Sequence, residues 1–247
     1  MGRLASVFYE TLGRLEESFE QLRRFTADVS HELRTPLTAI RVAVENMRGD
    51  LPPDDRRSQA TAAVAELDRL TRLFQDILDM ARIDAAAITI DRQWVAASDI
   101  VDAAMAHVRP ALEGHIIRID ADMNTEAEID PRLTSVALSH ILENATQYSP
   151  ADREIFVHAR VEHDGFHVSV TDHGPGLDPG ELEHLFERFY RGRSARQAAF
   201  GTGMGLSITR GLLAAAGGRV WAENVPGAGA RFSIVVPGPV RAAAVTQ

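Results

Sequence analysis

The sequence predicts an α+β protein in which an antiparallel helical hairpin precedes a two-layer domain of helices and strands. Apolar side chains recur every three or four residues as far as Asp84, which is the period of amphipathic helices. From Ile88 onward, helical segments are interspersed with short segments of strand pattern. The mixture of helices with mostly antiparallel strands indicates the α+β class.

Two helices form the predicted hairpin. The first covers residues 3–48, and the second runs from about Asp54 to Asp84 after the turn-forming stretch Gly49–Asp55. A short turn between two helices makes them antiparallel neighbours. One hairpin has too little core of its own, so we expect a homodimer in which two hairpins form a four-helix bundle. The seam of the second helix comprises Ala63, Leu67, Leu70, Phe74, Ile77 and Ala81.

The second domain is predicted element by element from the same periodicities. Its helices are expected at Ser98–Leu112 (capped by Ser98), Arg132–Tyr148, Pro179–Phe189 as a short helical piece, and Met204–Ala216. Its strands are expected at Ile88–Val95, His115–Ala121, Glu126–Ile129, Glu154–Glu162, Phe166–Asp172, Gly218–Glu223 and Arg231–Val236, with a turn at His163–Gly165. The last ten residues are rich in alanine and are expected to fray.

The composition excludes several classes of function. The chain has 247 residues, 45% of them hydrophobic and 25% charged, as in ordinary soluble proteins. The net charge of −9 argues against non-specific nucleic-acid binding, which needs a basic surface. There is no cysteine, so disulfides, thiolate metal sites and cysteine nucleophiles are excluded. No apolar run approaches the about 18 residues of a membrane span, and no signal peptide is visible.

The stretch Phe25–Ile40 places one histidine, His31, in a strongly helical segment. At the helical angle of about 100° per residue, His31 points away from the apolar stripe and into water. Glu32 follows it directly, and Thr35 lies one turn later on the same outer face. Such a histidine can be a nucleophile with its helpers, although an ordinary surface histidine gives the same pattern. Pro36 removes a backbone N–H and is expected to kink the helix.

Four polar residues, His140, Asn144, Gln147 and Tyr148, share one face of the predicted helix Arg132–Tyr148. The side-chain oxygen of Asn144 on such a face can bind Mg²⁺, which prefers oxygen ligands and keeps phosphates and waters in its shell. A polar helix face in solvent is the alternative interpretation.

Asp172 follows a predicted strand and opens the sequence Asp172–Leu177, which contains Gly174 and Gly176. A carboxylate at a strand end can accept a hydrogen bond from an adenine amino group, and the glycines let the backbone approach a base closely. An ordinary turn rich in aspartate, glycine and proline is the alternative.

Gly201–Leu206 is a glycine-rich segment that opens a predicted helix. Free N–H groups at a helix start suit phosphates. The segment lacks the lysine of a P-loop and does not follow a strand, so neither the P-loop nor the Rossmann pattern fits. The preceding aromatic and basic stretch, Leu185–Arg191, contains Phe186 and Phe189, which we expect to pack in the core.

These segments occur in an order and at spacings by which the chain, over about residues 20–237, resembles the catalytic core of a two-component sensor histidine kinase. The segments that are similar to the H, N, G1, F and G2 boxes of that family are SHELRTPL, HILENATQYS, DHGPGL, LFERFYRG and GTGMGL, at residues 30–37, 140–149, 172–177, 185–192 and 201–206. The resemblance implies an ATP-binding domain of the Bergerat type after the hairpin.

The resemblance implies a catalytic role for three residues. His31 would attack the γ-phosphate of ATP and become a phosphohistidine. Glu32 would orient the imidazole and accept its proton as a general base. Thr35 would position the water that removes phosphate from a partner's phosphoaspartate. Phosphoryl transfer would go to an aspartate on a separate response regulator.

The resemblance also implies an ATP site. Asn144 would hold Mg²⁺, with His140 and Gln147 nearby, and Asp172 would bind the adenine amino group. Tyr148 would stack over the base or the ribose. Glycines would shape the pocket and the ATP lid at roughly 191–203, and Arg188 or Arg191 would contact phosphates. The residues of the ATP site are Asn144, His140, Gln147, Tyr148, Asp172, Gly174, Gly176, Arg188, Arg191, Gly201, Thr202, Gly203, Gly205 and Leu206.

The implied domain order starts with the end of a HAMP linker at 1–19 and a dimerisation and phosphotransfer hairpin at 20–84. A hinge and first strand at 85–97, the catalytic ATP-binding domain at 98–237 and a tail at 238–247 follow. A HAMP linker follows a membrane helix, so the chain resembles the cytoplasmic part of a sensor anchored in a bacterial inner membrane by a segment absent here.

One departure from the family pattern concerns Gln147, where many members carry a lysine that reaches phosphate. Glutamine supplies hydrogen bonds without charge, so ATP would bind more weakly unless Arg188, Arg191 or Arg193 compensates.

Two other functions stay open at this stage. The glycine motifs also resemble the wider ATPase family of gyrase, Hsp90-type chaperones and mismatch-repair proteins, for which Glu143 is a candidate base for ATP hydrolysis. A dimeric coiled-coil adaptor with a degenerate nucleotide fold is the non-enzymatic alternative.

Overall fold

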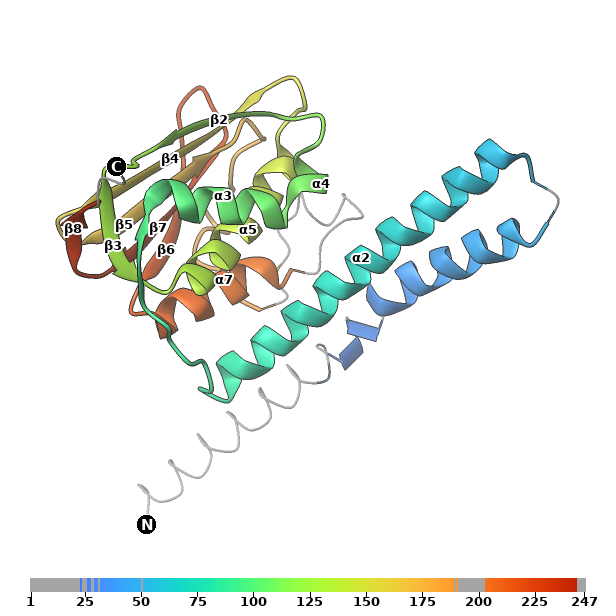
Figure 1. Cartoon of the computed structure of the whole chain (residues 1–247), viewed down its shortest axis with the longest axis horizontal. Coiled ribbons are helices and arrows are strands. Elements are labelled where there is room, and N and C mark those ends of the chain that lie inside the picture. Colours follow the sequence, from blue (N-terminus) through green and yellow to red (C-terminus); the bar gives the residue numbers. More distant parts are fainter. Residues whose placement is uncertain are drawn as a thin grey trace, which may run out of the picture. The chain divides into compact units, whose positions relative to one another are not determined.

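The computed structural model describes residues 23, 26, 27, 29, 30, 32–49, 51–188, 190 and 203–243. The chain divides into two compact units between Ile77 and Leu78. The predicted α+β class is confirmed, because a helical hairpin precedes a domain of helices and mixed sheet (Figure 1).

In the first unit, a helix that includes residues 32–47 lies antiparallel to α2 (Pro53–Asp84) (Figure 1). Pro53 opens α2, where its missing N–H is harmless, and two aspartates in the first turn suit the positive end of the helix dipole. The two helices meet at both ends of their overlap: Asn46 Nδ2 donates to Gln59 Oε1 at 3.5 Å, and Glu32 pairs with Arg69.

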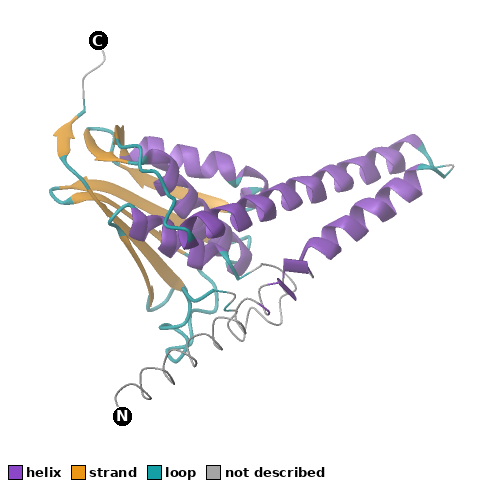
Figure 2. Ribbon diagram, turned by 90° about the horizontal axis from the view of Figure 1, so that it is seen from below, coloured by secondary structure: helices purple, strands orange, loops and turns teal. Residues whose placement is uncertain are grey.

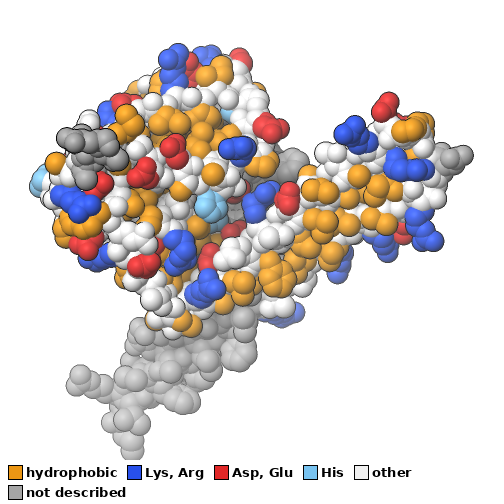
Figure 3. Space-filling view, viewed as in Figure 1, with side chains coloured by type: hydrophobic (Ala, Val, Ile, Leu, Met, Phe, Trp, Pro, Cys, Tyr) orange, Lys and Arg blue, Asp and Glu red, His pale blue; other side chains and the backbone are white. Residues whose placement is uncertain are grey.

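Hydrophobic side chains extend along the surface of the hairpin (Figure 3). Val64, Leu67 and Phe74 of α2 are 57%, 48% and 58% exposed, and Leu37 of the first helix is 53% exposed. Exposed apolar area of this extent on one element indicates a surface that is covered by a partner.

The second unit contains a five-stranded and a three-stranded sheet. The five-stranded sheet has the order β2-β4-β5-β7-β6, in which only β2 and β4 are parallel, and the smaller sheet has the antiparallel order β1-β3-β8. The elements are β1 (Gln93–Ala96), α3 (Ala97–His107), α4 (Arg109–Leu112), β2 (Ile116–Ala121), β3 (Thr125–Ile129), α5 (Pro131–Tyr148), β4 (Glu154–Glu162), β5 (Gly165–Thr171), α7 (Gly205–Ala215), β6 (Arg219–Asn224), β7 (Ala230–Pro237) and β8 (Val240–Ala242).

Helices α3, α5 and α7 cover one face of the five-stranded sheet and form the second layer (Figure 2). Strand β4 shows this one-sided covering: its side chains alternate between buried apolar positions and outward positions that are polar except for Phe156. The core between the layers includes the fully buried side chains Leu138, Ile141, Ile155, Phe166, Ile208 and Phe232.

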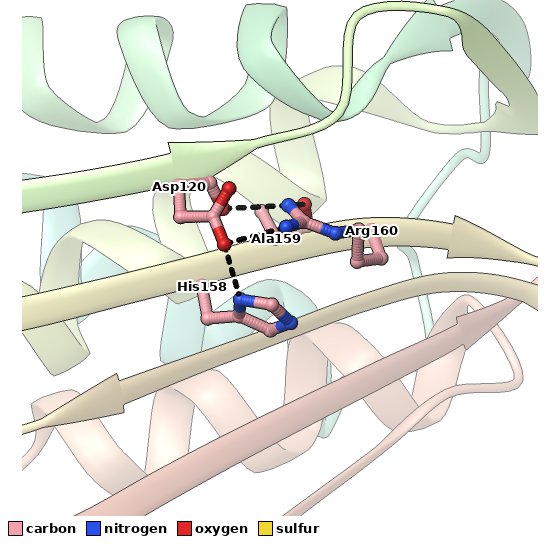
Figure 4. Close-up of polar contacts among 4 residues, drawn as sticks. All are labelled: Asp120, His158, Ala159 and Arg160. Carbon is pink, nitrogen blue, oxygen red and sulfur yellow. Dashed lines mark hydrogen bonds and ion pairs between the residues drawn. The ribbon is translucent and has the colours of Figure 1, made fainter.

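The outer face of the sheet carries a cross-strand polar cluster (Figure 4). Asp120 of β2 accepts hydrogen bonds from Arg160 at 2.5 Å and contacts His158 Nδ1 at 3.1 Å, both on β4. The two basic side chains lower the pKa of the Asp120 carboxyl, with the Arg160 hydrogen bond as the main cause. Because these groups are exposed, the cluster contributes little stability beyond fixing the β2–β4 register.

Two predictions at the start of this unit were wrong. The strand expected at Ile88–Val95 is confined to β1, because only residues 93–96 pair with β3. The helix expected at Ser98–Leu112 is divided in two at Val108, because Pro110 has no N–H to continue the first helix and sits in the first turn of α4. Ser98 is not the cap, since α3 already begins at Ala97.

Two further predictions failed later in the chain. Residues 179–188 form successive tight turns with bonds from residue i+3 to i, such as His184 N to Glu181 O at 3.0 Å, instead of a helix. The tail does not fray throughout, because β8 pairs with β3 and Arg241 binds Glu126 at 2.6 Å. An alanine-rich composition conceals such edge pairing. Phe186 is buried as expected, whereas Phe189 lies outside the described residues.

Candidate functional site

The segment around the candidate nucleophile lies on the first helix of the hairpin. Glu32 is partly buried, with its side chain 21% exposed, and its Oε2 lies 3.6 Å from Arg69 Nη2 on α2. Thr35 is exposed, and the helix continues through the buried Pro36 without interruption. His31 itself lies outside the described residues.

The second group of candidate residues begins on α5. Asp130 caps this helix by accepting a hydrogen bond from Leu133 N at 2.9 Å, and Pro131 occupies the first helical position. The opposite side of α5 is fixed in the core by a fully buried apolar stripe. This stripe holds the predicted polar face in place: His140, Asn144 and Tyr148 are partly buried, and Gln147 is exposed.

Asp172 follows the end of β5 and is 3% exposed. Its Oδ1 accepts two backbone hydrogen bonds, from Gly174 N at 2.8 Å and Ala230 N at 3.0 Å. Burial raises the pKa of the Asp172 carboxyl, and the two backbone N–H groups and nearby His173 oppose this shift. The structure thus fixes one carboxylate oxygen and keeps the side chain in a dry position.

Gly229 of the loop before β7 packs directly against this carboxylate. A Cβ at Gly229 would collide with Asp172 Oδ1 and would lie 2.5 Å from Gly174 N, so no larger residue fits there. On the other side, Ser149 Oγ accepts a hydrogen bond from His173 N at 2.8 Å. Asp172 is therefore held between the end of α5 and the start of β7.

The G1-like segment also contacts α5. A Cβ at Gly174 would lie 3.0 Å from the carbonyl oxygen of Tyr148. Gly176 has φ of +78°, the left-handed region that favours glycine. The next residue, Leu177, exchanges two hydrogen bonds with Asn224 of β6: Leu177 N donates to Oδ1 at 2.7 Å, and Asn224 Nδ2 donates to Leu177 O at 2.8 Å.

The G2-like segment contacts α5 at its other predicted residue, His140. Helix α7 begins at Gly205, directly after the buried Met204, and no side chain caps its N-terminus. A Cβ at Gly205 would lie 3.0 Å from His140 Nδ1. Burial lowers the pKa of His140, opposed in part by Glu143, so its imidazole is neutral at pH 7.

We expect Gly205→Ala to destabilise the domain by about 1–2 kcal/mol, because the added methyl group overpacks against His140. His140→Ala in the same chain should restore much of this loss, giving a coupling free energy of about 1 kcal/mol in a double-mutant cycle. Urea unfolding of the four proteins measures it. Gly180→Ala is the control, since its Cβ would meet only Asp178 Oδ1 at 3.5 Å; strictly additive effects would contradict the contact.

The arginine of the F-like segment has a different neighbour. Arg188 forms a two-pronged ion pair with Asp84, the last residue of α2, in which Nη1 donates to Oδ2 at 2.8 Å and Nη2 binds Oδ1. Both side chains belong to the second unit, and each is about half exposed.

The sequence motifs therefore meet around α5. Its C-terminal end contacts Gly174, and His140 contacts Gly205. Gly203 and Leu206 flank the start of α7, whereas Arg191, Gly201 and Thr202 lie outside the described residues. Sequence reasoning missed the supporting residues Ser149, Asn224, Gly229 and Ala230. A signal existed for Gly229 alone, in the glycine-rich turn PGAG at 226–229.

Two family models match the chain. Residues 21–86 match the His Kinase A (phospho-acceptor) domain, and residues 129–240 match the family described as histidine kinase-, DNA gyrase B- and HSP90-like ATPase. The sensor protein KdpD of Escherichia coli is 33% identical over 238 residues, and the sensor histidine kinase MtrB of Mycobacterium tuberculosis is 35% identical over 251. The chain belongs to the sensor histidine kinases.

These alignments cover 95% and 96% of this histidine kinase chain, but only 26% of KdpD and 44% of MtrB. The chain thus spans less than half the length of these relatives. Among solved structures, Acinetobacter baumannii histidine kinase AdeS has a TM-score of 0.63 at 19% identity, covering 84% of this chain and 98% of AdeS. Full-length ShkA in complex with AMPPNP has a TM-score of 0.61 at 26% identity, covering 88% of this chain and 46% of ShkA. In the described part of this kinase, no helix is long and apolar enough to cross a membrane.

Proposed function

We propose that this histidine kinase phosphorylates itself on His31 with ATP and transfers the phosphoryl group to an aspartate of a response regulator. The observation that carries the proposal is Asp172, a buried carboxylate at a strand end whose Oδ1 is held by two backbone N–H groups. It lies in the region that matches the ATPase family and beside the end of the helix that carries Asn144.

ATP would bind along the polar face of α5. The adenine amino group would donate to Asp172, and Tyr148 would cover the base or the ribose. The phosphates would extend toward the start of α7, where the first N–H groups of the helix lack side-chain caps. Gly174, Gly176, Gly203, Gly205 and Leu206, with Gly201 and Thr202, would shape this site.

The amide oxygen of Asn144 fits Mg²⁺, which accepts few protein ligands and completes its shell with phosphate oxygens and water. Bound Mg²⁺ would supply positive charge to the phosphates. His140 and Gln147 would lie beside this group, and Arg188 or Arg191 would supply the charge that Gln147 lacks.

In the reaction, a nitrogen of the His31 imidazole forms a bond to the γ-phosphorus while the bond to the bridging oxygen breaks and ADP leaves. Glu32 accepts the imidazole proton as the general base. The Arg69 guanidinium of α2 lies 3.6 Å from Glu32 and would help to orient its carboxylate.

The phosphoryl group then passes to the aspartate of a separate response regulator. Thr35, exposed one turn after His31, would position a water molecule that hydrolyses the regulator's phosphoaspartate. A relative from Mycolicibacterium smegmatis that is 33% identical is named a histidine-protein kinase/phosphatase, MprB, which supports this second activity.

The proposed assembly is a homodimer through the hairpin, with residues 20–84 as the dimerisation and phosphotransfer domain. A HAMP end at 1–19, a hinge at 85–97, an ATP-binding domain at 98–237 and a tail at 238–247 complete the order. The whole protein would be anchored in the bacterial inner membrane with this part in the cytoplasm, and nucleic acid is not an expected partner.

We expect Leu67→Glu combined with Phe74→Glu to convert the dimer to monomer, because the exposed apolar face of α2 would carry charge into the bundle core. Sedimentation equilibrium measures the mass. The control is Arg57→Glu with Arg72→Glu, on the same helix outside the seam. A wild type that is already monomeric at micromolar concentration would contradict the bundle.

The test of the proposed function is incubation of the chain with Mg²⁺ and γ-labelled ATP, followed by peptide mapping. Label that is acid-labile, base-stable and confined to the peptide with His31 supports the proposal. ATP consumption without protein-bound label would instead favour simple hydrolysis, with Glu143 as the base.

A further inference from the structure

The last turn of α2 forms a contact that the proposed reaction does not use. Asp84 closes the helix, and its carboxylate engages both Nη atoms of Arg188. A carboxylate is electrostatically unfavourable at the negative end of a helix dipole, so Asp84 gains more from a cation there than it would elsewhere. Paired forks of this kind are the strongest geometry for an arginine and a carboxylate.

Packing beside this ion pair holds the helix end in place. A Cβ added at Gly211 would lie only 2.6–3.1 Å from three side-chain carbons of Ile83. The side chain of Ile83 therefore packs against the backbone of α7. Met80 and Asp79 are 4% and 5% exposed. The end of α2 therefore packs on the helix whose N-terminus is the proposed phosphate site.

We propose that Asp84 is a positioning residue that competes with the nucleotide's phosphates for Arg188. The inference rests on the proposed function, in which Arg188 is a phosphate ligand. A guanidinium fork that is filled by a carboxylate cannot bind a phosphate through the same two nitrogens. Nucleotide binding and the Asp84–Arg188 pair therefore oppose each other, and by linkage each weakens the other by the same factor.

The expected size of the effect follows from the exposure of the pair. An exposed ion pair contributes less than a buried one, and a gain of about three- to fivefold in affinity is expected when the competing carboxylate is removed. The gain should apply to nucleotides with a polyphosphate and not to adenosine, because adenosine offers Arg188 no anion.

The experiment is calorimetric titration of the full chain with MgADP, MgATP and adenosine. The proteins are wild type, Asp84→Asn, Arg188→Gln and the double variant. Asp102→Asn, which removes one charge from an exposed position on α3, is the control. We expect Asp84→Asn to raise the affinity for MgADP and MgATP about three- to fivefold and to leave the affinity for adenosine unchanged. In the Arg188→Gln background, Asp84→Asn should not change any of these affinities.

Three results would overturn the proposal: unchanged or weaker nucleotide binding by Asp84→Asn, an equal gain for adenosine, or a gain that persists without Arg188. The readout is equilibrium binding, so it remains decisive if His31 takes up no phosphate. Failure of the proposed function would appear as absent labelling with intact binding, and failure of this inference as an unchanged ratio of ADP to adenosine affinity. Thermal unfolding of each variant verifies that it is folded.

Discussion

Replacement of His31 by glutamine should abolish protein-bound label from γ-labelled ATP. Glutamine keeps a polar side chain of similar length on a helix but has no nucleophilic nitrogen, since the lone pair of an amide is delocalised into its carbonyl. The hairpin offers no second imidazole in its place, because His31 is the only histidine in the sequence before His107. The measurement is acid-labile label after electrophoresis.

The affinity of the same variant for MgADP should equal that of wild type, because the proposed ATP site is built from α5, α7 and the Asp172 segment. His107→Gln, which changes an exposed histidine at the end of α3, is the matched control and should label normally. If His31→Gln still took up label, another residue would be the phosphoacceptor, and the proposed function would be contradicted.

Asp172→Asn should lower the affinity for ATP and ADP by about 10- to 100-fold, the cost of about 1.5–3 kcal/mol for a mismatched hydrogen bond to a charged group. The two N–H groups of Gly174 and Ala230 require an acceptor at the Oδ1 position. The asparagine amide oxygen must therefore take that position, and the NH₂ group then points toward the adenine amino group. Both of these groups are hydrogen-bond donors, so no hydrogen bond can form between them. The measurement is calorimetric titration with MgADP.

Asp178→Asn is the matched control for Asp172→Asn, because Asp178 is exposed in the turn that follows and its side chain accepts a hydrogen bond from Gly180 N at 2.9 Å within that turn. Since burial raises the pKa of Asp172, its ionised form is disfavoured in the folded state. The isosteric amide should therefore not lower the free energy of unfolding at pH 7, which separates lost binding from lost folding. If Asp172→Asn and wild type bound MgADP with equal affinity, Asp172 would not be the residue that recognises adenine.

The raised pKa of Asp172 also sets the direction of a pH effect on nucleotide affinity. Protonation converts the carboxylate from an acceptor into a donor toward the adenine amino group. As the pH falls, affinity should therefore decline at a higher pH than an ordinary aspartate would cause. The decline should be absent from the residual binding of Asp172→Asn.

The elements with strong local signals could be predicted from the sequence. Helix α5 and strand β4 were placed within one residue, because each has a long and regular apolar pattern. The division of α3 from α4 depends on Pro110 inside an otherwise helical pattern, and the edge strand β8 depends on pairing with a distant partner. Such tertiary pairing leaves no periodicity in a three-residue segment.

The candidate site followed the same rule. Asp172, His140 and Gly205 were proposed from the sequence because each belongs to a motif with its own chemical meaning. The partners that hold them were not: Ser149 and Asn224 look like ordinary turn and strand residues until the fold brings them to the Asp172 segment. Asp84 gave no signal, because the cation that it binds is 104 residues away.

The antiparallel pairing of β5 with β7 has a consequence for how much the length of the chain between the G1-like and G2-like motifs can vary. Thr171 pairs with Arg231, Asp172 N donates to Ala230 O and Gly229 N donates to Asp172 O, so the ends of β5 and β7 stay joined while the chain between them forms α7 and β6. In terms of chain entropy, the connection between the G1-like and G2-like motifs joins two segments that both already contact α5. Each doubling of its length would cost only about 0.6 kcal/mol. The segment between the G1-like and G2-like motifs can therefore gain or lose residues at little thermodynamic expense while Asp172 keeps its place.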